Sequence, residues 1–398
     1  MRILWFPGNG AIYANTNSYN GGGWTSSLAN VLVANGTNIQ FGMAIPWNKT
    51  FKEERNGVLF YGIPPIRRGI VGYSRKLKVQ IKVMKDIVCD FKPDVIHVFG
   101  SEHTGGMVST ITDIPVVLHI QGVMNYYNEA WLPQNLSWGK WICWHPRKWF
   151  QLKSIQRACK TELQIFKYCH NYIGRTAMDK RISSILSPGN TYFYCSEMLR
   201  PAIYNSEKVW RTHYGRKTKI IVSIISSPIY KGGDVILRAA KVLKEKLMMD
   251  FEWQVYGVNK MSDWERLTNI RADAVCVKCC GVISAEELVD IIMAADVYVH
   301  PSYIENSPNT VCEAQLLGIP VIANYVGGIP TLIQNGEDGI LVPANDVYQT
   351  ASYVYELCND AEKAVLMGSK GRTIALKRHN PQSIMNDLLL TYQTLIAQ

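Results

Sequence analysis

A chain of 398 residues is too long for one ordinary hydrophobic core, so its length predicts two domains. The composition, 47% hydrophobic and 19% charged, is typical of a folded soluble protein. The formal net charge of +10 favours an anionic partner, such as a phosphorylated substrate or an anionic membrane surface. Because the Lys and Arg residues are scattered, without a basic arm or an RNA-binding motif, we expect no nucleic-acid partner.

The N-terminal residues MRILWF form too short an apolar run for a signal peptide, and no stretch reaches the roughly 18–20 apolar residues of a membrane span. Ten cysteines without a secretion signal indicate a reducing compartment, so we expect a cytoplasmic protein. Cys276, Cys279 and Cys280 resemble a CxxC pair, but no second pair follows them. Their apolar surroundings favour buried thiols over a zinc site.

Short apolar runs alternate with longer segments of helical period. This alternation predicts an α/β fold with parallel sheets, and it runs twice, with the polar stretch 205–219 as a linker. In chain order the expected strands are 2–6, 39–45, 58–62, 94–99, 115–120, 191–195, 219–225, 252–257, 274–279, 296–300 and 320–323. The expected helices are 24–35, 75–91, 154–169, 232–248, 284–294, 308–317, 346–358, 361–378 and 381–397.

In doubly wound sheets ligands bind at the carboxyl ends of the strands, so the loops that follow strands are of most interest. The stretch ADVYVHPSYIENSPNTVCEAQLLGIP, residues 295–320, predicts a buried strand, a loop and a helix. We expect Ser307 as the N-cap, Pro308 as the first helical residue and Gly318 at the helix end. The free amides and the dipole of this helix start predict a site for a phosphate.

Two glutamates lie on either side of this helix start. Glu313 lies roughly 7–8 Å along the helix axis, about as far as the ribose hydroxyls of a nucleoside diphosphate held there. Glu305 precedes the helix and would lie near a sugar at the other side of the diphosphate. The alternative is that Glu305 caps a turn and Glu313 is a solvated helix residue, and spacing alone favours this alternative.

The same segment resembles the E-x7-E signature of retaining GT-B glycosyltransferases, in particular glycosyltransferase family 4. The resemblance continues through Glu313-Ala314 and GIPVIANYVGGIPTLIQNGEDGILVP, with weaker matches over most of the chain. It implies two Rossmann-like, doubly wound domains that face each other across a cleft. The implied division is an acceptor domain 1–205, a donor domain 206–378 and a last helix, 379–398, that returns to the first domain.

The resemblance implies a retaining, metal-independent transfer of a sugar from a UDP- or GDP-sugar to a hydroxyl of a glycan or lipid-linked glycan. No cofactor beyond this donor is expected, and no Asp-x-Asp metal motif appears in the right context. In the implied site Glu313 holds the ribose, Glu305 the donor sugar and Lys231 the diphosphate. Further donor contacts are implied for the loop and helix start, at Asn306, Ser307, Pro308, Asn309 and Thr310.

The sequence departs from the family pattern in several places. Asn306-Ser307-Pro308 replace a common Gly-Phe-Gly, and Pro308 has no backbone N–H to offer a phosphate. Ser226, kept as a candidate donor contact, stands where the family has an Arg five residues before its Lys. Because a leaving diphosphate needs positive charge, we expect another cation, and Arg200 and Arg175 are the candidates.

The first domain offers two further candidates. Gly22 and Gly23 lie between the first strand and a helix, where the family has a Gly-Gly loop beside the donor phosphates. His119 ends the strand 115–120, where the family has a His close to the transferred sugar. We interpret His300, which precedes Pro301, as a structural residue.

The stretch WLPQNLSWGKWICWHPRKWF, residues 131–150, is rich in tryptophan and in basic residues. Such a stretch suits a membrane interface, sugar stacking against an acceptor glycan, or simple packing, and the three readings stay open. The candidate acceptor or membrane residues are Trp138, Trp141, Trp144 and Lys148. Family members of this kind often extend bacterial surface polysaccharides such as lipopolysaccharide, which implies a peripheral place at the inner face of the membrane.

Two alternatives to a transferase remain. A nucleotide-sugar epimerase of GT-B type would have no use for the Trp-rich stretch and would need more acid–base residues. A non-catalytic sugar-nucleotide-binding protein is suggested by the missing Arg at Ser226.

Overall fold

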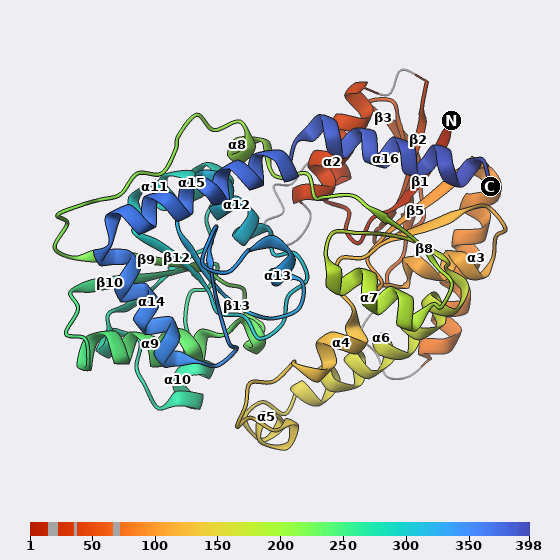
Figure 1. Ribbon diagram of the computed structural model, residues 1–398. Coiled ribbons are helices and arrows are strands. Elements are labelled where there is room, and N and C mark those ends of the chain that lie inside the picture. The colour runs from red at the N-terminus through yellow and green to blue at the C-terminus, as the bar shows by residue number, and fades with distance from the viewer. Residues whose placement is uncertain (15–22, 36–37, 67–71) are drawn as a thin grey trace. The chain divides into compact units, whose positions relative to one another are not determined.

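The computed structural model describes residues 1–14, 23–35, 38–66 and 72–398, and the chain divides into two compact units (Figure 1). The sequence places the domain boundary at residue 205, whereas the structure places it at Met198. The segment Glu129–Trp138, assigned to the first domain from the sequence, belongs to the second unit. Unit 1 comprises Met1–Asn128, Gly139–Met198 and His379–Gln398, and unit 2 comprises Glu129–Trp138 and Leu199–Arg378.

Unit 1 is built on an eight-stranded sheet in the order β3-β4-β2-β1-β5-β6-β7-β8, counted over the described residues. Its paired strands are parallel except for the antiparallel pair β3–β4. The strands are β1 (Arg2–Phe6), β2 (Gln40–Pro46), β3 (Lys52–Arg55), β4 (Val58–Ile63), β5 (Val95–Phe99), β6 (Val116–His119), β7 (Asn171–Gly174) and β8 (Thr191–Tyr194). Its helices are α1 (Ala11–Ala14), α2 (Gly23–Asn35), α3 (Tyr73–Phe91), α4 (Met124–Glu129), α6 (Lys148–Tyr168), α7 (Ala177–Leu186) and α16 (Pro381–Ile396).

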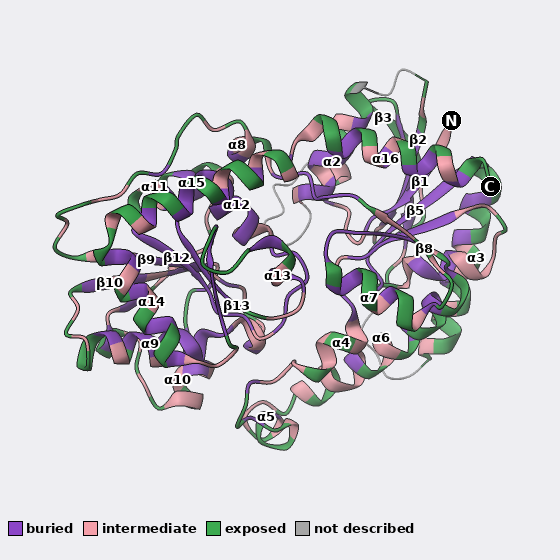
Figure 2. Ribbon diagram, in the orientation of Figure 1, coloured by how far each residue is buried: buried purple, intermediate pink, exposed green. Residues whose placement is uncertain are grey.

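The central strands of the unit 1 sheet are buried on both faces, which explains why β1 is apolar from Ile3 to Phe6 (Figure 2). Side chains alternate between the two faces of a strand. Ile3 and Trp5 therefore pack into one core with residues of α2 and α16, while Leu4 and Phe6 pack into the other with residues of α3 and α6. The last helix thus completes one face of the first sheet.

Unit 2 is built on a six-stranded, fully parallel sheet in the order β11-β10-β9-β12-β13-β14, again over the described residues. The strands are β9 (Lys219–Ile224), β10 (Phe251–Tyr256), β11 (Val277–Gly281), β12 (Val297–His300), β13 (Val321–Asn324) and β14 (Ile340–Val342). The helices are α8 (Pro201–Tyr204), α9 (Gly233–Glu245), α10 (Ser262–Thr268), α11 (Ala285–Ala294), α12 (Asn309–Leu317), α13 (Ile329–Leu332), α14 (Val347–Asn359) and α15 (Ala361–Arg378). A further helix, α5 (Trp138–Trp144), begins at the end of the segment that joins unit 2.

The strand order of unit 2 fixes where a ligand would bind. The chain runs outward from β9 through β10 to β11, and then outward on the other side from β12 through β13 to β14. The topological switch point therefore lies between β9 and β12. In sheets of this kind the crevice for ligands lies beyond the carboxyl ends of the strands at the switch point. The expected α/β class with parallel sheets is confirmed.

Candidate active site

The loops that follow β9, β12 and β13 are joined by backbone contacts at the carboxyl end of the unit 2 sheet. The amide of Tyr303 donates to the carbonyl of Tyr230 at 2.8 Å, and the amide of Gly328 donates to the carbonyl of Glu305 at 3.0 Å. Gly232 has φ +78, and a Cβ there would lie 2.0 Å from the carbonyl oxygen of Pro301. Only glycine allows the two loops to approach so closely.

Glu305 lies in the loop after β12 as a buried carboxylate with two partners. The ammonium of Lys231, from the loop after β9, forms an ion pair with Oε1, and Nε2 of His300 lies 3.2 Å from the same oxygen. Burial alone would raise the pKa of Glu305, but Lys231 and His300 outweigh it and lower the pKa to about 2. The carboxylate is therefore charged at neutral pH.

His300 links Glu305 to the start of α12, which sequence reasoning missed. Its other ring nitrogen, Nδ1, lies 3.3 Å from the hydroxyl of Tyr298, two residues earlier on β12. The hydroxyl of Tyr298 is in turn hydrogen-bonded to the side chain of Thr310, and burial raises its pKa. The spacing of Tyr298 and His300, which places both side chains on one face of the strand, was the available signal.

Glu313 lies within α12 and is held by Arg200, at the N-cap of α8. Nε and Nη2 of Arg200 donate to Oε1 and Oε2 of Glu313, each at 2.8 Å. The side chain of Glu313 is 2% exposed, so it is not the solvated helix residue of the alternative reading. A bidentate pair of this kind fixes the direction of the carboxylate.

The start of α12 differs from the expected arrangement. The helix begins at Asn309, and Pro308 rather than Ser307 is the N-cap, because Pro308 has extended backbone angles (φ −72, ψ 116). Among the described residues no side chain caps this helix, and Asn306 and Ser307 are buried in the preceding loop. Prolines carry no hydroxyl or amide to cap with, so the amides of Asn309 and Thr310 remain suited to an anion.

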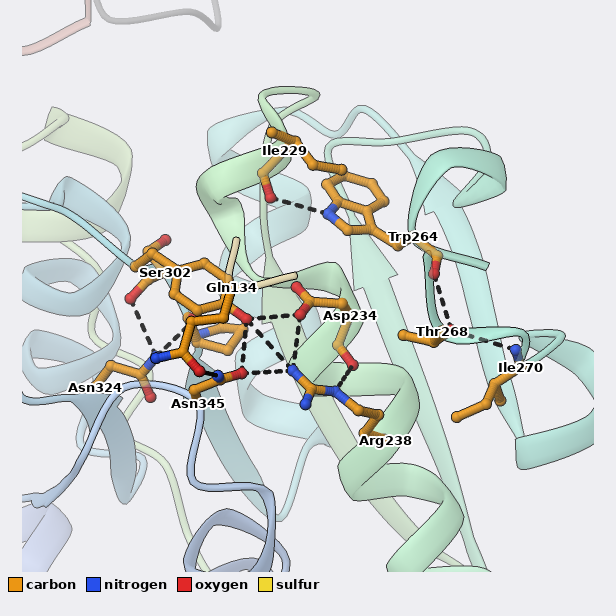
Figure 3. Close-up of polar contacts among 12 residues, drawn as sticks. Gln134, Ile229, Asp234, Arg238, Trp264, Thr268, Ile270, Ser302, Asn324 and Asn345 are labelled. Atoms are coloured by element: carbon orange, nitrogen blue, oxygen red, sulfur yellow. Dashed lines mark hydrogen bonds and ion pairs between the residues drawn. The ribbon is translucent and has the colours of Figure 1, made fainter. Parts of the chain in front are cut away.

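A polar network holds the loop after β12 against α9 and the segment Glu129–Trp138 (Figure 3). The hydroxyl of Tyr303 donates to Asp234 at 2.6 Å, and Arg238 donates to the same carboxylate at 2.8 Å. Asn345 accepts from Arg238 at 2.5 Å and donates to Gln134 at 2.6 Å. These bonds fix Tyr303, two residues before Glu305, and so make the loop rigid.

The remaining candidate on the loop after β9 is Ser226, which is partly exposed and lies in the same loop as Lys231. In unit 1, Arg175 is buried, with its guanidinium 5.1 Å from the ring centre of Trp24 and Nε 3.7 Å from the carboxylate of Glu197. Within unit 2 the structure brings Lys231 and Arg200 together with the two glutamates, while Arg175 belongs to unit 1.

His119 ends β6, as expected from the sequence, but it is fully buried. Its ring stacks with His97 and Phe99 and meets Trp24 edge-on, and neither ring nitrogen has a hydrogen-bond partner among the described residues. Burial, followed by the charges of His97 and Arg175, lowers its pKa well below the usual value, so the ring is neutral. Gly23 begins α2, and Gly22 lies outside the described residues.

The Trp-rich stretch forms α5 and the first turn of α6. Lys140 lies 5.2 Å from the ring centre of Trp144, and Lys148 lies 5.1 Å from that of Trp141. Trp141 is buried, so it is not a surface anchor, whereas Trp138 and Trp144 are partly exposed. Within residues 131–150 the most exposed aromatic side chains are those of Trp149 (41%) and Phe150 (53%), which follow the four candidates in the chain and were missed.

None of the described helices has the length and apolar character needed to cross a membrane.

The two parallel-sheet units and the returning last helix define the GT-B fold, and whole-chain similarity to solved structures shows the same. Sucrose-phosphate synthase from Thermosynechococcus elongatus superposes with a TM-score of 0.75 at 17% identity, over 100% of this chain and 99% of that one. HepE of Anabaena, solved in complex with UDP and glucose, superposes with a TM-score of 0.64 at 15% identity, over 99% and 100%.

The sequence similarity covers part of the chain. Residues 216–360 match the family described as Glycosyl transferases group 1, which supports that family for this segment. A D-inositol 3-phosphate glycosyltransferase of Corynebacterium aurimucosum is 30% identical over 157 residues, 38% of this chain and 37% of the relative. A protein of the same name from Thermobifida fusca is 29% identical over 177 residues, 42% and 41% of the two chains. The matched region thus spans less than half of each relative.

Proposed function

We propose that the protein is a retaining, metal-independent glycosyltransferase that moves a sugar from a nucleoside-diphosphate sugar to a hydroxyl of an acceptor. The observation that carries this proposal is the pair of buried carboxylates, Glu305 and Glu313, each joined to a cation beside a helix start without a side-chain cap. The site lies at the switch point of a GT-B donor-type unit. The similarity of residues 216–360 to glycosyl transferases group 1 supports the same function.

In the proposed reaction the diphosphate lies at the start of α12, with Lys231 beside it. Glu313, held by Arg200, accepts the ribose hydroxyls, and Glu305 accepts hydroxyls of the donor sugar. The bond between the anomeric carbon and the diphosphate oxygen breaks, and the acceptor oxygen forms the new bond on the same face. The acceptor's proton passes to the departing diphosphate. The protein supplies position and positive charge, and no side chain acts as a nucleophile.

We favour a UDP-sugar over a GDP-sugar as the donor, because HepE, a structural neighbour, is solved with UDP and with UDP-glucose. The acceptor is proposed to be a glycan or a lipid-linked glycan of a bacterial surface polysaccharide. Between Ala130 and Thr161 the chain carries no acidic residue, while Trp149 and Phe150 are exposed. A surface of this composition suits an anionic membrane, where a lipid-linked acceptor would be found.

A thermal-shift screen against UDP, GDP, ADP and CMP, with their common sugars, tests the donor site. A ligand that binds only the folded protein raises its melting temperature, so one nucleotide should give a clear shift that Glu313→Ala abolishes. If no nucleotide shifts the melting temperature, the proposal is wrong. Because Ser226 stands where the family has an Arg, a second candidate function is that of a non-catalytic sugar-nucleotide-binding protein. It would show the shift but release no nucleotide from the sugar with any acceptor.

A further inference from the structure

Unit 2 contains a pocket that the proposed donor site does not use. It has a volume of about 670 Å³, and its walls come from α9, from residues 343–348 at the start of α14, from Ile270 and from Gln134. The donor site lies at the N-terminal end of α9, where Lys231 precedes the helix, whereas the pocket is lined by the later stretch 238–246. Its volume lies within the roughly 300–1,000 Å³ of small-molecule sites.

The hydrogen-bond network of Figure 3 holds the polar part of this pocket in place. Arg238 donates to the buried carboxylate of Asp234 at 2.8 Å and to Asn345 at 2.5 Å. Asn345 in turn donates to the amide oxygen of Gln134 at 2.6 Å. Among the described residues the amide nitrogen of Gln134 has no hydrogen-bond partner. A side chain that its neighbour already holds therefore offers N–H donors to a ligand in the pocket.

The charged residues of the pocket carry both signs. Lys241 and Glu245 lie 4.0 Å apart on one face of α9, and Lys246 follows them. Asp346 accepts from the backbone amide and the side chain of Gln349. A purely anionic ligand would meet two carboxylates here, so the charges do not favour it. A hydroxyl group both donates and accepts, so a ligand with many hydroxyls can bind cations and carboxylates alike.

The pocket also has an apolar part, with one aromatic ring. The side chain of Tyr348 is 75% exposed, and the pocket's other apolar residues include Val242, Ile270 and Pro343. A sugar ring has C–H groups on its face and hydroxyls at its edge. It can therefore stack on an aromatic ring while its hydroxyls bind polar groups beside that ring.

We propose that this pocket is a sugar-binding site, separate from the donor site, for a pyranose unit of a glycan. The sugar ring lies on Tyr348, and its hydroxyls bind the amide of Gln134 and the charged side chains of α9. This inference goes beyond the proposed function and does not depend on it, because the pocket shares no residue with the carboxylates Glu305 and Glu313 or with their cations.

Saturation-transfer NMR with the methyl glycosides of glucose, galactose, mannose, rhamnose and N-acetylglucosamine tests the site. At least one of them should bind the wild-type protein with a Kd in the millimolar range. Tyr348→Ala should weaken this binding about tenfold, because the sugar loses its stacking surface. Tyr355→Ala is the matched control and should bind as the wild type does, because Tyr355 is an exposed tyrosine of the same helix that does not line the pocket.

A second variant, Ala344→Trp, fills the pocket. Ala344 lines the pocket, so a larger side chain there would occupy the space of the ligand. The glycoside that binds the wild type should no longer bind to Ala344→Trp, while the circular dichroism spectrum shows that the variant is folded.

The inference is wrong if none of the glycosides binds the wild-type protein, or if Tyr348→Ala and Tyr355→Ala bind with the same affinity. Inorganic phosphate is a further probe: if phosphate binds, and Lys246→Gln but not Tyr348→Ala removes this binding, the pocket is an anion site and the inference is overturned.

Nucleotide binding separates this inference from the proposed function. Tyr348→Ala should keep the melting-temperature shift that a nucleotide gives the wild type. If no nucleotide gives a shift but a glycoside binds through Tyr348, the proposed function fails and this inference stands. If a nucleotide gives a shift but no glycoside binds, this inference alone is overturned.

Discussion

Replacing Glu305 by Gln should remove a pH-dependent part of the protein's stability. The pKa of Glu305 lies at about 2 in the folded protein, against an ordinary value of 4.5, and this gap corresponds to about 3 kcal/mol of unfolding free energy. Because the folded-state pKa is the lower one, the contribution is fully present above pH 4.5. It is lost as the pH falls from 4.5 toward 2. At pH 7 we therefore expect Glu305→Gln to be less stable than the wild type by about 3 kcal/mol.

Urea unfolding followed by tryptophan fluorescence, from pH 7 down to pH 3, measures this difference. The gap between wild type and Glu305→Gln should stay constant down to about pH 5 and then narrow. Comparing the two proteins at each pH cancels the other acidic groups, whose titration they share. If the gap does not change with pH, Glu305 does not have a lowered pKa, and the account of its pairing with Lys231 and His300 is wrong.

Gly232→Ala should lower the melting temperature and abolish nucleotide binding in the thermal-shift assay, because a Cβ would lie 2.0 Å from the carbonyl oxygen of Pro301; an unchanged melting temperature would contradict the close approach of the two loops. Replacing Lys140, Arg147 and Lys148 by Gln should weaken sedimentation with vesicles of anionic lipid by about 1 kcal/mol per charge near the surface. If the wild-type protein never sediments with such vesicles, the membrane proposal fails. Addition of EDTA should leave the rate of sugar transfer unchanged, and loss of transfer that Mg²⁺ or Mn²⁺ restores would refute the metal-independent mechanism.

The local pattern was sufficient to predict the strand, loop and helix from residue 296 to 317, whereas the roles of its two glutamates were predicted only with the resemblance to the glycosyltransferase signature. That stretch is contiguous, and the alternation of a buried strand, a proline and a helix ending in glycine is a local signal. The α/β class followed in the same way from the alternation of elements. The short strands β3, β7 and β14 were missed. The residues of β3 are polar and exposed, at the sheet edge, so they carry no apolar pattern.

Lys231 and Arg200, which pair with the two glutamates, lie far away in the sequence, and no periodic pattern indicates these pairs. Arg200 and Glu313 are more than a hundred residues apart in the sequence. The sequence therefore predicted Arg200 only as one of two candidates for the missing cation. The identity of the N-cap was also wrong, because Ser307 and Pro308 both fit the start of a helix and only the backbone angles decide between them. Trp141 was wrongly predicted as a surface candidate. Aromatic residues occur both in cores and on surfaces, and the local sequence does not distinguish the two.

The path of the chain has a consequence for synthesis on the ribosome. The first sheet is made early, yet one of its faces is closed by Ile384, Leu388 and Tyr392 of α16, and the hydroxyl of Tyr392 accepts a bond from the indole of Trp5 at 2.9 Å. Residues 1–198 therefore leave the ribosome with this apolar face uncovered until the whole of unit 2 has been translated. Domains usually fold in the order in which they are made, whereas here the first unit to begin folding is the last to finish.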